Sequence, residues 1–402
     1  METRKIPLAI DSADATALID FASALVRTES PSGREEADVR LAARTMEELG
    51  FDEVLIDGFG NALGRIGNSG PSILFDSHLD TVEAGDAAAW RVPPFSGLIG
   101  DGRLHGRGSV DMKSGAAASI FAAALARDAG LVEGRTVYVS CTVLEEDCDG
   151  ENLVHLFRET GIRPDRCVVC EPSNARLAVG HKGKAQVAIR TEGVSAHGST
   201  PELGVNAVYP MAAVIARVER QARGLETGPE PRGTLALTRV ASEAVSLNAV
   251  PAACEVYLDR RLAPGESVAD FRRSMDDLVA GTGASWRVGS LRRRTWTGLE
   301  VRYEPLHEAW RLEDGDPFLD AAVEAYRDAF GAGPDPFLFW NFSTNAVATT
   351  ARSIPTLGFG PGDPALAHMV DESCPLEQIL GACRLYQALI ARLVPDGEGA
   401  RG

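Results

Sequence analysis

Apolar and polar positions alternate along the first part of the chain with two different periods. Apolar residues spaced three and four apart predict helices over residues 13–27, 34–49 and 116–128. Asp11 or Ser12 is a suitable N-cap for the first of these helices. Short, mostly apolar runs predict strands over residues 72–75, 136–144 and 166–170. Strands that alternate with helices are typical of an α/β fold with a mainly parallel sheet covered on both faces.

The pattern changes at residue 185. Strand, helix, two strands, helix and strand are predicted over residues 185–192, 205–220, 234–240, 253–262, 268–280 and 286–291. This order is that of a ferredoxin-like unit. The first pattern then returns, with a helix over 317–330, a strand over 354–359 and a helix over 375–393. We therefore predict a catalytic metal-binding domain, residues 1–184 and 299–402, with an inserted lid and dimerisation domain, residues 185–298.

Length, charge and cysteine content narrow the class of protein. A chain of 402 residues is long enough for about two domains. The net charge of −17 argues against nucleic acid or an anionic membrane as the main partner, because both would be repelled. The N-terminal stretch lacks the apolar run of a signal peptide, and seven scattered cysteines fit a reducing compartment. We expect a cytoplasmic protein.

Candidate chemistry lies in five segments, most of which follow an apolar strand. The segments, with their acidic and imidazole side chains, are SILFDSHLDTV (His78, Asp80), GRGSVDMKSG (Asp111), VYVSCTVLEED (Glu145, Glu146), CVVCEPS (Glu171) and GFGPGDPALAHMVDE (His368). Sites in open α/β sheets form beyond the carboxyl ends of the strands, so these segments are expected to converge. His105, His155 and His307 have no such setting and are predicted to be structural.

The expected cluster has the composition of a metal site. Carboxylates and imidazoles that gather in one place repel and raise one another's pKa values unless a cation holds them. Two histidines and three carboxylates form a mixed nitrogen and oxygen set that suits zinc, cobalt or manganese. One carboxylate can bridge two metal ions about 3.5–4 Å apart. Asp111, between a glycine-rich turn and a predicted helix, is well placed to do so.

The order of these motifs resembles that of a known family. HxDTV, GRGxxDMKxG, EEx, EPS and a late AHxxxE together look like the acetylornithine deacetylase, succinyl-diaminopimelate desuccinylase and carboxypeptidase G family of metallopeptidases. The resemblance implies that His78 and Glu171 hold one metal ion, that Glu146 and His368 hold the other, and that Asp111 bridges them. It also implies that Asp80 fixes the tautomer of His78 and that Glu145 is the general base.

The inserted domain carries further matches. GVSAHGSTPELGVNA resembles the family segment whose histidine, here His197, stabilises the oxyanion, often in the site of a dimer partner. SLNAVPAACEVYLDRR matches a second segment and implies substrate contacts by Asn248 and Arg261. The planar guanidinium of Arg261 suits a carboxylate, and an ion pair with Asp259 is the structural alternative. The resemblance also favours a homodimer formed through the lid domain.

One segment departs from the family. FSTNAVA, residues 342–348, replaces a Gly-Gly-Thr type of substrate loop, and with GHKGK and EEDCDGE it is nearest to a branch of hydrolases linked to selenium or purine metabolism. We predict a two-metal amide hydrolase that releases the acyl group from an N-acyl amino acid or a related small amide with a free carboxylate. A metallo-carboxypeptidase or dipeptidase is the alternative, and a non-catalytic binding protein on the same scaffold is a more distant one.

Overall fold

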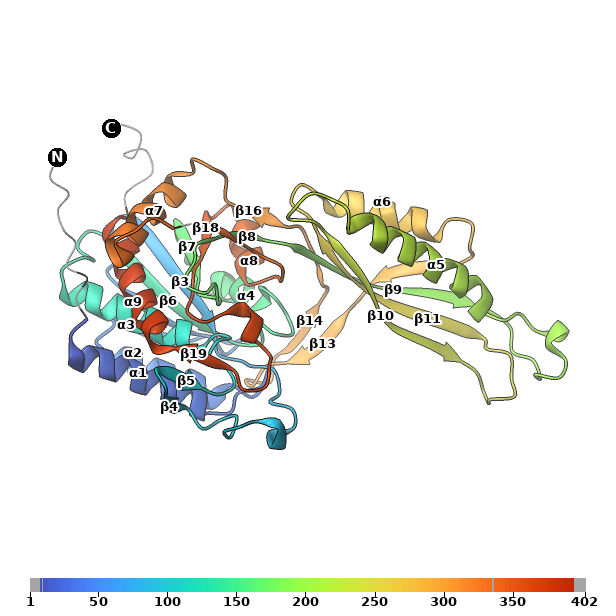
Figure 1. Cartoon of the computed structure of the whole chain (residues 1–402), viewed down its shortest axis with the longest axis horizontal. Coiled ribbons are helices and arrows are strands. Elements are labelled where there is room, and N and C mark those ends of the chain that lie inside the picture. Colours follow the sequence, from blue (N-terminus) through green and yellow to red (C-terminus); the bar gives the residue numbers. More distant parts are fainter. Residues whose placement is uncertain (1–7, 9, 335, 394–402) are drawn as a thin grey trace.

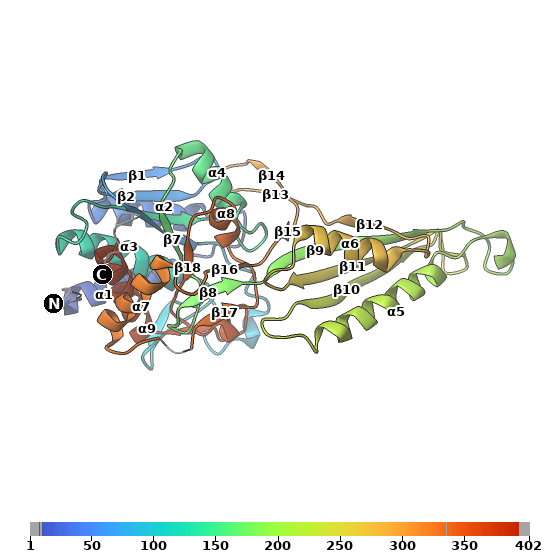
Figure 2. The same cartoon turned by 90° about the horizontal axis from the view of Figure 1, so that it is seen from above.

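A computed structural model describes residues 8, 10–334 and 336–393, and it has two bodies side by side (Figures 1 and 2). Residues 1–7 and 394–402, which the predicted catalytic domain includes, lie outside the described residues. The start of the N-terminal stretch that lacks the apolar run of a signal peptide therefore lies outside them too. Within the described part of the chain, no helix has the length and apolar character needed to cross a membrane.

The larger body is built on a mixed sheet. Its strand order is β1-β2-β6-β3-β7-β18-β8-β16, and β17 also pairs with β8. The four central strands are parallel: β6 (Thr136–Thr142), β3 (Ser72–His78), β7 (Arg166–Val169) and β18 (Thr356–Gly358). The outer strands are β1 (Glu53–Ile56), β2 (Ala62–Ile66), β8 (Ala178–His181), β16 (Trp310–Arg311) and β17 (Leu338–Trp340). The prediction of an α/β domain with a mainly parallel sheet is confirmed.

Helices cover both faces of this sheet. On one side α1 (Ser12–Arg27), α3 (Lys113–Asp128), α7 (Pro317–Phe330) and α9 (Leu376–Ala391) pack together, while α4 (Glu151–Thr160) and α8 (Ala346–Thr350) lie on the other (Figure 1). Helix α2 (Glu36–Glu48) packs on β1, β2 and β6. Of the two N-cap candidates for α1, the side chain of Asp11 accepts hydrogen bonds from the backbone N–H groups of Ala13 and Asp14.

Helix α3 approaches the sheet closely because its side chains are small. Almost every residue from its first turn onward is buried, and most of them are alanine. A Cβ atom at Gly115 would lie 2.5 Å from the carbonyl oxygen of Cys170, so only glycine allows this contact. The N-terminus of α3 is therefore held against the end of β7, at the edge of the sheet where the candidate residues gather.

The smaller body has its own sheet and its own apolar core. It consists of β9 (Gly183–Glu192), α5 (Val208–Leu225), β10 (Thr234–Glu243), β11 (Ala253–Leu262), α6 (Val268–Val279) and β12 (Ser285–Val288), with sheet order β10-β11-β9-β12. Strand β15 (Leu306–His307) also pairs with β9. Val187, Val256, Met211 and Phe271 belong to a hydrophobic cluster separate from that of the larger body. The order of elements is the one predicted.

Two small sheets complete the fold. The hairpin of β13 (Leu291–Arg294) and β14 (Glu300–Tyr303) contributes Val301 and Tyr303 to the core of the larger body. Strands β4 (Leu98–Gly100), β5 (Arg103–His105) and β19 (Ser373–Pro375) form the other small sheet. The division into residues 1–184 with 299–402 and residues 185–298 remains our proposal for the domains.

Candidate metal centre

The candidate residues meet at one edge of the larger sheet. His78 is the last residue of β3, while Glu145 and Glu146 follow β6 and Glu171 follows β7. These three strands are neighbours and parallel, so their carboxyl ends lie at the same edge. His368 comes from the loop after β18, the next strand of the sheet, and Asp111 lies two residues before the start of α3.

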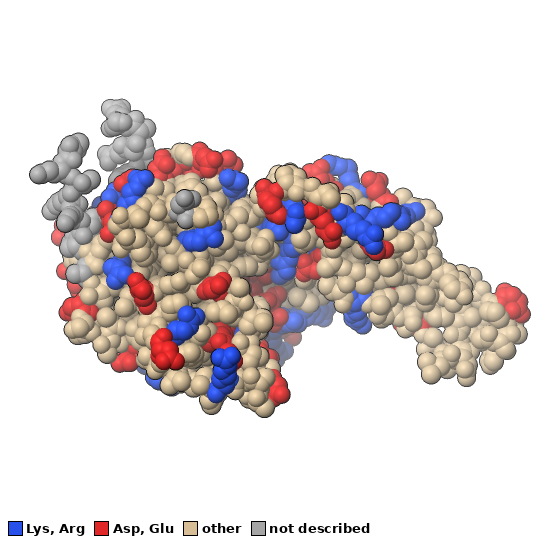
Figure 3. All heavy atoms as spheres, in the orientation of Figure 1, with Lys and Arg blue, Asp and Glu red and all other residues tan. Residues whose placement is uncertain are grey.

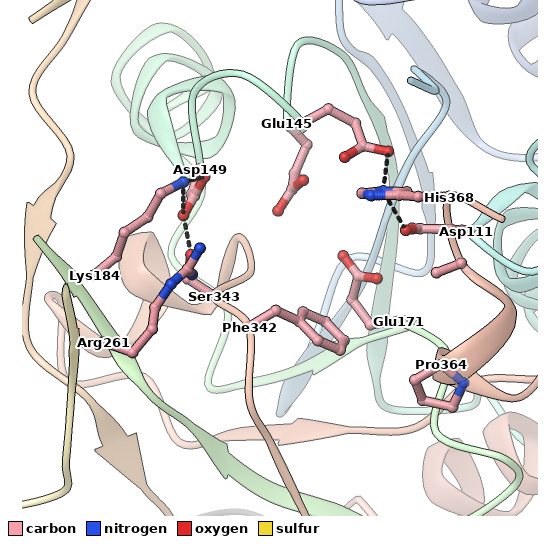
Figure 4. Close-up of a pocket in the computed structure, with 12 residues that line it drawn as sticks. Asp111, Glu145, Asp149, Glu171, Lys184, Arg261, Phe342, Ser343, Pro364 and His368 are labelled. Atoms are coloured by element: carbon pink, nitrogen blue, oxygen red, sulfur yellow. Dashed lines mark hydrogen bonds and ion pairs between the residues drawn. The ribbon is translucent and has the colours of Figure 1, made fainter. Parts of the chain in front are cut away.

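Asp111 connects the two histidines of the cluster. Its Oδ1 atom lies 3.0 Å from His78 Nε2, and its Oδ2 atom lies 3.1 Å from His368 Nε2. His368 Nε2 is also 3.0 Å from Glu146 Oε1 (Figure 4). On the other side, His78 Nε2 is 3.5 Å from Glu171 Oε1. The five residues predicted as metal ligands therefore lie in one cluster.

Two overlapping groups of side chains in this cluster could each hold a metal ion. His78, Asp111 and Glu146 form one group, and His78, Glu145 and Glu171 form the other, with potential ligand atoms within 4.8 Å of one another. Glu145 Oε2 is 3.9 Å from His78 Nε2, and Glu145 Oε1 is buried without a hydrogen-bond partner in the described part of the chain. The geometry is thus compatible with Glu145 as a metal ligand, as well as with the role of general base that the resemblance implies.

The charges of the cluster are strongly perturbed. Burial raises the pKa of Glu145 and of Glu171 well above the ordinary value, and neighbouring carboxylates add to the effect. Burial also disfavours ionised Asp111, but its hydrogen bonds with His368 and His78 outweigh this and lower its pKa. The same contacts with Asp111 and Glu146 raise the pKa of His368 to about 10. In this cluster the positive charge of the imidazoles balances the carboxylates. Divalent cations would supply the same balance, and the donor set fits such ions.

Asp80 holds the Glu145–Glu146 turn as well as His78. His78 Nδ1 is 2.9 Å from the backbone oxygen of Asp80 and 3.5 Å from its Oδ1 atom. The same carboxylate accepts the backbone N–H groups of Glu145, at 3.0 Å, and Glu146, at 3.1 Å. The contact nearest to His78 is thus the backbone carbonyl of Asp80, and the carboxylate mainly fixes the turn that carries two of the cluster's carboxylates.

Sequence patterns did not point to Glu35, which supports the same turn. Its buried Oε1 atom accepts the N–H of Leu144 at 3.1 Å, and Leu144 has a positive φ of 61°. Burial, with the charge of Asp80 as the second cause, raises the pKa of Glu35 to about 8. In the sequence Glu35 looks like the start of a solvated helix, so only the three-dimensional contact reveals its role.

A second unpredicted pair supports Asp111 and His368. Buried Glu372 accepts the backbone N–H groups of Val110, at 2.8 Å, and Asp111, at 3.2 Å, and forms an ion pair with Arg107. Arg107 in turn donates to the backbone oxygen of His368 at 3.2 Å. The pair therefore ties the segment before α3 to the loop that carries the second histidine.

A pocket of about 290 Å³ lies beside the cluster. This volume suits a small molecule. Asp111, Glu145, Glu146, Glu171 and His368 form one wall, and the other residues that line it are Asp149, Lys184, Arg261, Phe342, Ser343, Pro364 and Ala367. Figure 4 shows the carboxylate of Glu145 between the cluster and the Lys184 side of the pocket. The pocket thus brings a cationic wall from the smaller body opposite the acidic cluster of the larger one.

The segment in which the sequence departs from the family, residues 342–348, lines this pocket. Phe342 and Ser343 are exposed to it, and the hydroxyl of Ser343 contacts the Asp149 carboxylate. Asn345 is buried and donates to Asp76 Oδ2 at 2.9 Å, while its side-chain oxygen accepts the N–H of Gly150 at 2.8 Å. Phe342 and Ser343 therefore shape the pocket, and neither of them belongs to the acidic cluster.

Arg261 forms the ion pair with Asp259 and also lines the pocket. Its Nε and Nη2 atoms lie 2.8 and 3.2 Å from the two carboxylate oxygens of Asp259. The same side chain lines the pocket opposite the acidic cluster. Asp259 therefore orients the guanidinium without removing it from the pocket.

His197 and Asn248 lie together, away from this pocket. The N–H of Gly198 donates to the backbone oxygen of Asn248 at 2.6 Å, and both predicted residues are exposed. His197 follows the end of β9, a strand of ten residues that begins at the pocket and spans about 33 Å (Figure 1). Neither residue lines the pocket of its own chain.

The other histidines differ in their surroundings. His307, predicted as structural, has its Nε2 atom 3.5 Å from Asp149 Oδ2, behind the pocket wall. His155 lies with Asp57 and Glu159 in a third group of potential ligands. The carboxylate of Asp57 already accepts hydrogen bonds from Gly60 and Asn61, so this group is explained as a structural network.

Comparison with known proteins agrees with this geometry. Residues 74–392 match the profile of Peptidase family M20/M25/M40. The chain is 33% identical to the uncharacterized protein YgeY of Escherichia coli (strain K12), with 92% of each chain covered. It is 31% identical to the succinyl-diaminopimelate desuccinylase of Caulobacter sp. (strain K31), with 96% of this chain and 97% of that protein covered. An M20 family metallo-carboxypeptidase from Sulfolobus solfataricus has the same fold, with a TM-score of 0.74, 16% identity, and 96% and 99% of the two chains covered.

Proposed function

The chain belongs to Peptidase family M20/M25/M40, a family of metal-dependent hydrolases of amide bonds, and from this premise we propose that it releases the acyl group from an N-acyl amino acid or a similar small amide with a free carboxylate. The observation that carries the proposal is the pairing of Asp111 with both His78 and His368 beside a small pocket whose opposite wall is cationic.

The proposed cofactor is a pair of divalent metal ions. His78 and Glu171 would hold one ion and Glu146 and His368 the other, with one oxygen of Asp111 directed at each site. Zinc fits the donor set best, and cobalt and manganese are the alternatives. When bound, two such ions polarise the scissile carbonyl and lower the pKa of a water molecule.

Glu145 is the proposed general base. Its carboxylate faces the pocket, and its raised pKa suits a group that accepts a proton from the attacking water and then delivers it to the leaving amine. The Asp80 carboxylate fixes its backbone, so the proton acceptor is held in position before substrate binds. This role competes with direct metal ligation by Glu145, and the two are separable by experiment.

We propose that the protein works as a homodimer. The end of the smaller body exposes several apolar side chains, namely Val194, Leu203, Val205, Val245 and Leu247. In Figure 3 this end shows few charged side chains on the visible face. A second copy that covers it would bring His197, and Asn248 beside it, toward the partner's pocket, where the imidazole would stabilise the oxyanion.

A metallo-carboxypeptidase or dipeptidase is the second candidate. The named activity of the Sulfolobus solfataricus structure supports it, and the same pocket would then hold the C-terminal residue of a short peptide. A non-catalytic binding protein is disfavoured because every predicted ligand, Glu145 and Asp80 are all in place.

The decisive test is a substrate panel with metal depletion and reconstitution. We expect hydrolysis of at least one N-acetyl or N-succinyl amino acid, loss of that activity after chelation, and recovery with zinc, cobalt or manganese. Hydrolysis of dipeptides alone would favour the second candidate. If the metal-loaded protein bound panel members without hydrolysing any of them, the proposed function would be wrong.

A further inference from the structure

Lys184 and Arg261 stand directly opposite each other on neighbouring antiparallel strands. Lys184 is the second residue of β9, Arg261 is near the end of β11, and their Cα atoms are register partners. Both side chains line the pocket, on the wall that faces the acidic cluster (Figure 4). Like charges at directly opposite positions of a sheet destabilise it, so this juxtaposition requires compensation.

Each cation is held by one carboxylate but keeps a donor available. Lys184 Nζ lies 2.9 and 3.2 Å from the two oxygens of Asp149 and 5.7 Å from the centre of the Tyr303 ring. An ammonium group has three N–H donors, and Asp149 uses two of them at most. Arg261 directs Nε and Nη2 at Asp259, while Nη1 has no acceptor among the described residues.

Asp149 acts as a support for Lys184 and is also engaged by residues of the larger body. Its carboxylate is buried and also contacts the hydroxyl of Ser343, with His307 Nε2 at 3.5 Å. Burial would keep it neutral, but Lys184 and His307 outweigh burial and lower its pKa, so it is ionised. The charge of Asp149 is thus balanced by Lys184, whereas Lys184 and Arg261 each keep an N–H donor without a partner among the described residues.

The resemblance already implies a substrate contact by Arg261, and we propose that Lys184 is the second donor to the free carboxylate of the substrate and determines the preference for acids over their uncharged amides. The inference rests on the proposed function, since it assigns the substrate class of the same pocket. Two donors preorganised by Asp149 and Asp259 can reach one carboxylate from both sides without losing their own partners. The negative charge of the ligand would also relieve the repulsion between the two opposed cations.

The test measures binding, so that it does not depend on turnover. The ligands are the Nα-acetyl derivatives of alanine, leucine, glutamate and lysine, each next to its carboxamide. Calorimetry is done on the zinc-loaded protein with Glu145→Gln, which prevents consumption of the ligand. We expect the acid to bind more tightly than its amide. Adding Lys184→Met should weaken binding of the acid about tenfold to a hundredfold and change binding of the amide little, because one charged hydrogen bond is lost.

A double variant separates ligand binding from a purely structural role. Lys184→Met leaves the buried Asp149 carboxylate without its lysine counter-ion, which could disturb the pocket by itself. Lys184→Met with Asp149→Asn removes both charges, and replacing both partners is nearly neutral for folding. If Lys184 served only as the counter-ion of Asp149, the double variant would recover the preference for the acid. We expect that it does not. Arg287→Met, which removes an exposed cation paired with Glu255 on the same domain, should leave the preference unchanged.

Three results would contradict the proposed role of Lys184. An unchanged ratio of acid to amide affinity in Lys184→Met, recovery of the ratio in the double variant, or no preference for any acid in the parent protein would each overturn the inference. Failure of the proposed function is a different result, namely no hydrolysis of any panel member by the zinc-loaded protein with Glu145 intact.

Discussion

His368 Nε2 lies 3.1 Å from Asp111 Oδ2, although the two residues come from sequence segments on opposite sides of the inserted domain. The other oxygen of the same carboxylate is committed to His78. Asp111 is therefore the one described carboxylate that contacts both histidines of the cluster, and the two metal positions that we propose would both depend on it.

Asp111→Ala should remove both metal ions, because a bridging carboxylate contributes to each site. His368→Ala should remove about one of the two, since among the described residues its imidazole contacts the carboxylates of Asp111 and Glu146. Elemental analysis of the purified, dialysed variants measures this directly. Equal losses in the two variants would mean that Asp111 does not bridge. His105→Ala, outside the cluster, is the control for preparation losses.

Glu145→Gln should lower kcat by about a hundredfold to ten-thousandfold while metal content stays close to that of the wild-type protein. The amide keeps the shape of the side chain but accepts no proton. Stopped assays on an accepted substrate, with metal analysis of the same sample, provide the two readouts. Loss of metal along with activity would identify Glu145 as a ligand, in agreement with its position beside His78 and Glu171.

Glu35→Gln should change how stability depends on pH. The folded protein keeps the Glu35 proton up to about pH 8, whereas the unfolded chain releases it near 4.5. The wild-type contribution is therefore complete below pH 4.5 and lost as pH rises from 4.5 to 8. Relative to the wild-type protein, the variant should gain at most about 1.4 kcal/mol of unfolding free energy for each pH unit in this window.

Urea unfolding of the chelator-treated proteins at the two ends of that window measures the difference. Glu48→Gln, at an exposed position of the same helix, is the matched control and should show no such trend. A constant difference between Glu35→Gln and the wild-type protein at all pH values would show that Glu35 is ionised in the folded state.

His197→Ala should lower kcat by about a hundredfold to a thousandfold if the imidazole serves the oxyanion. Because His197 is far from the pocket of its own chain, we expect it to act in the partner's site. Mixing the inactive His197→Ala and Glu145→Gln proteins under conditions of subunit exchange should then restore about a quarter of the wild-type activity, since each mixed dimer has one complete site. No recovery despite proven exchange would mean that His197 serves the site of its own chain, and an unchanged kcat in His197→Ala would place it outside catalysis.

The acidic cluster could be predicted from the sequence because its members follow strands with a clear apolar pattern. His78, Glu145, Glu146 and Glu171 each come at or just after the end of a buried strand, and parallel pairing brings such ends together. The helices α1, α3, α7 and α9 were predictable for a similar reason, since their apolar spacing extends over three or more turns.

The supporting residues were not predictable in this way. Glu35, Glu372 and Asp149 are charged residues of loops or helix starts, and their burial depends on partners far away in the sequence. Strands such as β8 and β16 are only two to four residues long and have no measurable period. The positions of His197 and Asn248 relative to the pocket also require knowing how far β9 extends.

Lys184 and Arg261 lie on strands β9 and β11 of the smaller body's sheet, Lys184 at the junction with the larger body, whereas the acidic cluster belongs to the larger body. If Lys184 and Arg261 bind the substrate carboxylate as proposed, the angle between the two bodies sets the distance from that carboxylate to the amide bond at the metal centre. Substitutions at the junction, for example near Gly183 or His307, would then change which substrate length is accepted without altering any group that contacts the substrate.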